Sequence, residues 1–159
     1  MRFLLALLLT LTCTAAIAAD WGSYDNSRFG YAIAVPPGFA GEGVAANGDG
    51  QVFRSADGTQ EFRAWGGNII EASFELAMEA AMSHAGGDGW RLSQQRVTPS
   101  WASYTGSRNG IVLEARTIAL CGGRQFAAFS IEYPERDLAE MERVIARLAG
   151  SLRGTGTGC

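Results

Sequence analysis

The stretch "RQFAAFSIEYPERDLAEMERVIARL", residues Arg124–Leu148, changes its apolar period half-way along, and this change decides the fold. In its first half every second residue is apolar, which predicts a strand from Arg124 to Tyr133. From about Asp137 to Leu152 the apolar residues recur every three or four positions, which predicts a helix. Asp137, with Glu140 three residues later, is typical of a capping-box-like start. The apolar stripe of this helix consists of Leu138, Met141, Ile145, Leu148 and Leu152.

The segments before this stretch follow the same two patterns. "FGYAIAV" (residues 29–35) alternates and predicts a strand, with a shorter strand expected around Tyr24. "SFELAMEAAMSHAGG" (residues 73–87) predicts a helix, with Ser73 as N-cap and Gly86-Gly87 as its stop. Residues 90–98 and 101–120 are expected to be extended, with a turn at Asn109-Gly110. The order of strands, helix, strands, helix predicts α+β architecture: a largely antiparallel β-sheet flanked by two main helices.

The segment "AANGDGQVFRSADGTQEFRAWGG", residues 45–67, is rich in Asn, Asp and Gly and raises the question of a metal or phosphate loop. A calcium loop that began at Asn47 would need glycine at its sixth position and an acid at its twelfth. Those positions hold Val52 and Gly58, and no Gly-Lys-Ser/Thr sequence opens a helix. Asp57-Gly58 between two alternating runs predicts a hairpin instead. We therefore expect turns here and no bound ion.

The N-terminus has the pattern of an export signal. Arg2 precedes the apolar block "FLLALLLTL", and small residues follow, so cleavage is expected near Ala18 or Ala19. The apolar block is shorter than the roughly 20 residues of a membrane span, and no transmembrane span is predicted in the mature chain. The sequence thus predicts a signal peptide (residues 1–19), a single α+β domain (20–152), a Gly/Thr-rich C-terminal tail (153–159), and a periplasmic or secreted location.

The charge of the chain argues against a nucleic-acid partner. The 159 residues carry 13 basic and 16 acidic side chains, for a formal net charge of −3 at pH 7. Proteins that bind nucleic acid neutralise many phosphates with a basic surface. No strongly basic patch is visible in this sequence.

Cys121 and Cys159 are the two cysteines that remain after removal of the signal peptide. An even count in an oxidising compartment favours a disulfide, and only one pairing is possible. The predicted strand leads away from Cys121, the predicted helix runs back, and the tail is long enough to return Cys159 to its neighbourhood. The alternative is a free or intermolecular thiol at the C-terminus.

The sequence offers few of the residues and motifs that catalysis or metal binding would need. His84, the only histidine, would need a nucleophile and an orienting carboxylate, and the sequence has no Gly-x-Ser-x-Gly elbow. One histidine without a Cys-x-x-Cys motif predicts neither a metal site nor a cofactor. Paired carboxylates stay open as an alternative, although alternation favours outward-facing positions for them. The glutamates concerned are Glu61, Glu71, Glu114 and Glu132.

Aromatic and arginine residues are the most suggestive candidates for binding, because such clusters mark recognition surfaces. Arg63 and Trp65 have the same strand parity, so they are predicted to project from one face and to form one side of a groove. For the other members of the group, burial in the core is the competing interpretation. The whole group is Trp21, Tyr24, Arg28, Arg54, Arg63, Trp65, Trp101 and Tyr104.

Four features of the mature chain form a recognisable pattern: "YDNSRFGYAIAVPPGF", "WASYTG…GIVLEART", "FSIEYP" and a final helix that ends in "SL". With this pattern the chain resembles small exported bacterial proteins of the PsbP-like α/β/α sandwich type, and the resemblance covers nearly the whole mature chain. The fold is shared by an extrinsic subunit of the photosynthetic oxygen-evolving complex and by a nuclear Ran-binding protein. The resemblance contains no catalytic motif and assigns no site residues, and it implies a non-enzymatic role.

The sequence therefore predicts an exported, non-enzymatic binding or accessory protein of the cell envelope. The kind of partner expected is an envelope protein. The alternative is a small carboxylate-dependent hydrolase. A third reading is a structural envelope protein that binds nothing specific. An enzyme should show a deep pocket in which two acids converge, whereas an accessory domain should show a filled interior and an exposed apolar or aromatic patch.

Overall fold

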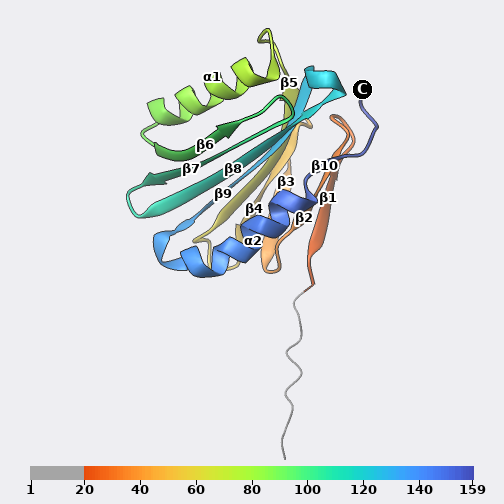
Figure 1. Cartoon of the computed structure of the whole chain (residues 1–159). Helices are drawn as coiled ribbons and strands as arrows, with labels where there is room; N and C mark the ends of the chain where they lie inside the picture. Colours follow the sequence, from red (N-terminus) through yellow and green to blue (C-terminus); the bar gives the residue numbers. More distant parts are fainter. Residues whose placement is uncertain (1–19) are drawn as a thin grey trace, which may run out of the picture.

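The computed structural model describes residues 20–159, so the predicted signal peptide lies outside the described residues. Ten strands, two α-helices and two short 3-10 turns follow one another along this part of the chain (Figure 1). In order they are β1 (Gly22–Asn26), β2 (Tyr31–Val35), β3 (Phe39–Val44), β4 (Gly50–Ser55), β5 (Glu61–Asn68), α1 (Phe74–Gly87), β6 (Arg91–Val97), β7 (Trp101–Arg108), β8 (Ile111–Leu120), η1 (Cys121–Gly123), β9 (Gln125–Pro134), η2 (Glu135–Asp137), α2 (Leu138–Ser151) and β10 (Arg153–Gly154).

Two antiparallel sheets organise the molecule. The larger has seven strands in the order β3-β4-β5-β9-β8-β7-β6, and the smaller has the order β1-β2-β10. The predicted turns join neighbouring strands, with Gly58 at φ 70° and Gly110 at φ 76°, backbone angles that glycine adopts without strain. This arrangement confirms the predicted α+β architecture with an antiparallel sheet. The tail begins as a strand, since β10 pairs with β2.

Helix α1 begins as predicted and ends later than predicted. The Ser73 hydroxyl accepts a hydrogen bond from the Leu76 N–H (3.3 Å). The helix continues through Gly86 and Gly87, because the left-handed residue that ends it is Gly89, at φ 88°. Neither α1 nor α2, the helices of residues 20–159, has the length and apolar content of a membrane span.

Helix α2 differs from its prediction at its first turn. Asp137 lies in a 3-10 turn and makes no side-chain cap, so the capping-box prediction is wrong. Its carboxylate instead accepts a hydrogen bond from the Gln60 side chain (3.2 Å). Leu138, predicted to be buried, is 47% exposed, while Met141 and Leu148 are buried. The 3-10 turn sets where the helix starts, and Leu138 falls at the margin of the buried stripe.

One face of the seven-stranded sheet, which we call the α2 side, is covered over β4, β5 and β9 by α2 and by the small sheet (Figure 1). Phe62 of β5 and Phe129 of β9 lie at its centre with their rings 6.2 Å apart. Tyr31 from the small sheet and Leu148 from α2 pack onto the same cluster, and both are fully buried. Large side chains from four elements, β5, β9, β2 and α2, therefore fill this layer.

The opposite face, the α1 side, is only partly covered. Helix α1 packs over β6 and β7, at one edge of the sheet (Figure 1). Its buried residues Phe74, Met78 and Met82 form a second, smaller cluster with Ala102 of β7. The part of this face built by β3, β4 and β5 carries no helix (Figure 1).

The predicted disulfide joins Cys121, in the turn between β8 and β9, to Cys159, 38 residues later in the sequence. The tail reaches it along the small sheet, where the Thr155 N–H donates to the Gly30 carbonyl (2.8 Å). The bond therefore ties the end of the chain to the seven-stranded sheet.

Candidate functional site

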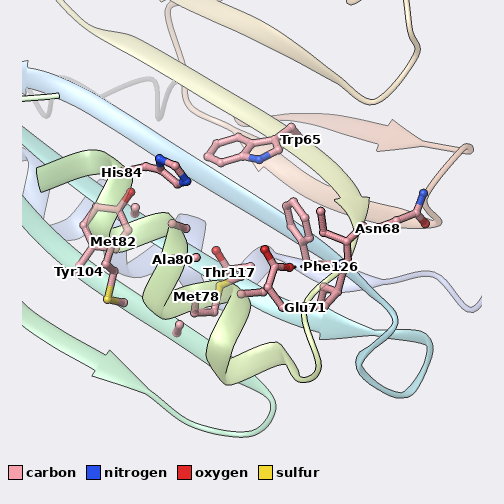
Figure 2. A pocket seen from close by; sticks show the side chains of 16 residues that line it. Trp65, Asn68, Glu71, Met78, Ala80, Met82, His84, Tyr104, Thr117 and Phe126 are labelled. Atoms are coloured by element: carbon pink, nitrogen blue, oxygen red, sulfur yellow. Dashed lines mark hydrogen bonds between the residues drawn. The ribbon is translucent and has the colours of Figure 1, made fainter. Parts of the chain in front are cut away.

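A cleft of about 300 Å³ lies on the α1 side, between α1 and the sheet (Figure 2). We call it the α1 cleft. This volume is at the small end of the range for sites that bind small molecules or single side chains. Its lining is mostly apolar and comes from five elements, β5, α1, β7, β8 and β9, and from the loop before α1. The lining includes Trp65, Ile70, Met78, Met82, Tyr104 and Phe126.

Small residues form the floor of the α1 cleft. Ala102 of β7 and Ala115 of β8 are both buried and both line it. Phe126 forms one end, because its ring lies against Gly67 of β5: a Cβ at Gly67 would come within 2.7 Å of that ring. Short side chains under a helix leave space that larger ones would fill. The cleft is thus a consequence of the alanines and the glycine in these strands.

Trp65 stands between the α1 cleft and a second hollow. It is paired in register with Gly50 of β4, where a Cβ would come within 2.8 Å of the Trp65 Cβ. The second hollow, of about 370 Å³, lies over β3, β4 and β5, and we call it the β4 groove. Trp65 lines both hollows. Arg63 lines the β4 groove together with Glu42 and Asp49, so the two binding candidates predicted from sequence border one groove.

Trp65 differs from the other three tryptophans of residues 20–159 in having no guanidinium over its ring. Trp21, Trp90 and Trp101 each lie against at least one arginine, with guanidinium carbons 4.2–5.5 Å from the ring centroid. Arg63, two residues away, forms an ion pair with Glu61 instead. The ring of Trp65 is therefore available for contact with another molecule.

The polar groups of the α1 cleft are spread along it. His84 is in the last turn of α1, whereas Glu71 precedes the helix, and roughly 16 Å of helix axis separates the two ends. Figure 2 shows the two side chains in different parts of the cleft. The Glu71 carboxylate accepts a hydrogen bond from the Ile70 N–H (3.3 Å). Burial raises the pKa of the Tyr104 hydroxyl, so this group stays neutral.

The eight aromatic and arginine residues singled out in the sequence do not form one surface. Tyr104 lines the α1 cleft, but Trp101 is an odd number of positions away on the same strand and faces the other way. Tyr24 belongs to the core, with its ring 5.7 Å from that of Phe53. Arg54 is held between Glu42 and Glu61. Of the eight, Trp65, Tyr104 and Arg63 border the two hollows.

The four glutamates considered for catalysis do not meet in one pocket. Glu61 and Glu132 are directly opposed in register, on the α1 side, and Glu61 is tied to Arg54 and Arg63. Glu114 faces the α2 side, where it accepts hydrogen bonds from the Thr105 hydroxyl (3.1 Å). Burial raises the pKa of Glu114 above its ordinary value. Within residues 20–159 no group of three or more His, Cys, Asp or Glu side chains is placed to hold a metal ion.

Sequence reasoning missed the exposed apolar rim of the α1 cleft. Ile70, in the loop between β5 and α1, is 91% exposed. The signal was available in "NIIEAS" (residues 68–73), where two isoleucines follow the end of a predicted strand. It also missed Ala115 and Phe126, whose roles depend on strand neighbours far away in the sequence.

Comparisons with protein-family models and with curated proteins find no match. Among solved structures, the chain is similar to cyanobacterial PsbP from Synechocystis sp. PCC 6803, with a TM-score of 0.60 and 15% identity over 90% of this chain and 97% of that one. It is also similar to the Saccharomyces cerevisiae Ran-binding protein Mog1p, with a TM-score of 0.59 and 10% identity over 87% and 97% of the two chains. Identities this low establish the architecture alone: the chain has a PsbP-like fold, as its sequence predicted.

Proposed function

We propose that this chain is an exported, non-enzymatic binding or accessory protein of the cell envelope. Its partner is an envelope protein that inserts an apolar side chain into the α1 cleft and packs against Trp65 and Ile70. The disulfide supports the export part of the proposal, because such bonds persist in oxidising compartments. The PsbP-like fold supports an accessory role by analogy only, since the solved structures include a Ran-binding protein.

The single observation that carries the proposal is the position of Ile70. This side chain is 91% exposed and lies at the rim of an apolar cleft. A small molecule inside the cleft would leave most of Ile70 in water. A protein surface that fills the cleft and extends past its rim would cover both Ile70 and the ring of Trp65. Large exposed apolar residues beside a cleft are typical of protein interaction sites.

The distribution of acids supports the non-enzymatic part. Glu71 is the one carboxylate among the lining residues of the α1 cleft, and His84 lies near the other end of α1. A carboxylate-dependent hydrolase needs two carboxyl groups within about 10 Å that flank one substrate bond. Glu61 and Glu132 are close enough as cross-strand neighbours, but Glu61 is paired with Arg54 and Arg63, and neither glutamate lines the α1 cleft or the β4 groove. The hydrolase therefore stays the weaker alternative.

Site-specific photo-crosslinking in living cells tests the proposal. A benzophenone amino acid replaces Ile70 in one variant and Leu138 in a control variant. Leu138 is also an exposed apolar residue (47%), but it lies at the start of α2, away from the cleft. We expect one discrete crosslinked partner from position 70 and none of that mass from position 138.

Two further changes sharpen this test. Ala115→Leu fills the floor of the cleft, and Trp65→Ala removes its wall, so each should reduce the crosslink from position 70 at least fivefold. A folded protein with no crosslink at position 70 would count against the proposal. An unchanged crosslink in the Ala115→Leu variant would show that the partner does not enter the cleft.

A further inference from the structure

A row of charged and aromatic side chains crosses the other face of the sheet, away from the α1 cleft. Arg96 of β6 is paired in register with Ser103 of β7, which is paired with Arg116 of β8. Directly opposed residues in a sheet project from the same face, so the two arginines flank the Ser103 hydroxyl. Trp101, two residues before Ser103, projects from that face as well. We call these four residues the Arg–Trp row.

The ring of Trp101 holds both guanidinium groups in place. The Arg116 guanidinium carbon lies 4.5 Å from the ring centroid, and that of Arg96 lies 5.5 Å from it. Cation–π contacts of this kind restrain long side chains that would otherwise sample many rotamers. Both positive groups are therefore preorganised against the Trp101 ring before any ligand arrives.

Neither arginine of the row is neutralised within the described part of the chain. The ion pairs there use Arg54, Arg63 and Arg136, and none uses Arg96 or Arg116. The Arg116 Nε–H is buried and has no hydrogen-bond partner. Burial lowers the pKa of Arg116, which reflects the cost of an uncompensated charge in this place. A buried donor without a partner in a native structure calls for a ligand, an ion or a water molecule.

The nearest acid does not serve this purpose. Glu114 is on the same face and the same strand as Arg116, but both of its oxygens accept from the Thr105 hydroxyl (3.1 Å). The strand neighbours of the row on this face are apolar: Ile118 is the register partner of Trp101, and Phe129 is that of Arg116. The Ser103 hydroxyl, within the row, is a further donor. The site thus presents guanidinium and hydroxyl donors and lacks a matching acceptor.

We propose that the Arg–Trp row binds the carboxylate side chains of an acidic segment of a partner protein. Each guanidinium group matches a carboxylate in geometry and charge, and two of them on one tryptophan can engage two acidic side chains of the same segment. The row lies on β6, β7 and β8, at the end of the α2 side where Arg96 is exposed, and it lines neither the α1 cleft nor the β4 groove, so a small anion would find no enclosed site there. The net charge of −3 opposes broad contact with nucleic acid or an anionic membrane, and a local contact to a peptide avoids that repulsion. The inference does not depend on the α1 cleft.

Nuclear magnetic resonance of the arginine side chains tests the inference directly. The probe is an end-capped octaglutamate peptide, titrated into the full folded chain, with the Nε–H signals of Arg116 and Arg96 as the readout. We expect a saturable shift of the Arg116 signal. Arg96→Gln and Arg116→Gln should each weaken the apparent affinity at least fivefold, because each removes one of the two guanidinium groups. Arg143→Gln, an exposed arginine of α2 with the same change in charge, should weaken it less than twofold.

Three outcomes would overturn the inference. The first is the absence of any shift with octaglutamate at millimolar concentration. The second is an equal loss of affinity in the Arg143→Gln variant, which would reveal nonspecific attraction. The third is a shift produced equally by inorganic phosphate or by phosphatidylglycerol vesicles at the same anionic charge, which would identify a different ligand. Arg96 is exposed, so the Arg96→Gln variant should fold. Its affinity therefore tests the inference even if the Arg116→Gln variant is unstable.

Discussion

The two faces of the seven-stranded sheet are built from different kinds of residue, and they differ in what they leave open. On the α2 side, Phe62, Phe129 and Leu148 are at most 1% exposed and fill the space beneath α2 and the small sheet. On the α1 side, Ala102 and Ala115 lie beneath a helix that covers one edge of the sheet, and a cleft of about 300 Å³ remains. Side-chain volume therefore separates a closed layer that stabilises the fold from an open layer that can bind.

The difference in packing between the two layers is tested most directly by removing one large side chain from each. Phe62→Ala should lower the free energy of unfolding by about 3–5 kcal/mol, because it leaves a closed cavity among fully buried rings. Met82→Ala should cost about 2 kcal/mol, at the low end for such changes, because Met82 lines a cleft that is already open. Urea denaturation followed by circular dichroism measures both. Equal losses would show that the two layers are packed alike.

The disulfide provides the next largest effect, and it should act mainly on the α2 side. Replacing Cys121 and Cys159 together by serine should lower the free energy of unfolding by about 2–4 kcal/mol, since the bond closes a loop of 38 residues. Hydrogen exchange should become faster in β10 and the tail and stay unchanged in α1. Reduction of the wild-type protein is the control and should give the same pattern. Two reactive thiols in the unreduced, denatured protein would contradict the bond itself.

The smallest expected effect concerns Glu114, at the margin of the α2 side. Burial raises the pKa of Glu114 in the folded state, so the folded protein binds this proton more tightly than the unfolded chain does. The free energy of unfolding should therefore fall as the pH rises from the ordinary glutamate range through the raised folded-state pKa. Glu114→Gln keeps an acceptor for Thr105 and should flatten this part of the pH profile.

Much of the fold could be predicted from local pattern. The alternation of Phe129, Ile131 and Tyr133 identified β9, and the Asn109-Gly110 and Asp57-Gly58 pairs identified two hairpin turns. These features depend on residues close together in the sequence. The errors occurred at helix ends, at Leu138 and Gly87, where the 3-10 turn and the position of a left-handed glycine decide the boundary.

The candidate sites could be predicted only in part. The parity of Arg63 and Trp65 placed both on one face, and they do border one groove. The α1 cleft could not be predicted in this way, because it joins β5 and α1 to β7, β8 and β9. The Arg–Trp row could not be predicted either, because it depends on the registers of two strand pairs, and the β6–β7 register shifts between Ser93 and Arg96. Arg96 and Arg116 are 20 positions apart and meet only through their pairing with β7.

The amino-acid sequence by itself determined the class of secondary structure at each position, the antiparallel architecture and the cysteine pair, because periodicity and turn chemistry act over a few residues. Only the tertiary structure decided that α1 covers a single edge of the sheet, that no arginine among residues 20–159 lies over the ring of Trp65, and that two arginines share Trp101. The physical reason is that space and unpaired charge are properties of neighbours in three dimensions. A local sequence pattern does not specify where packing will leave a cleft or which charged group will have no partner.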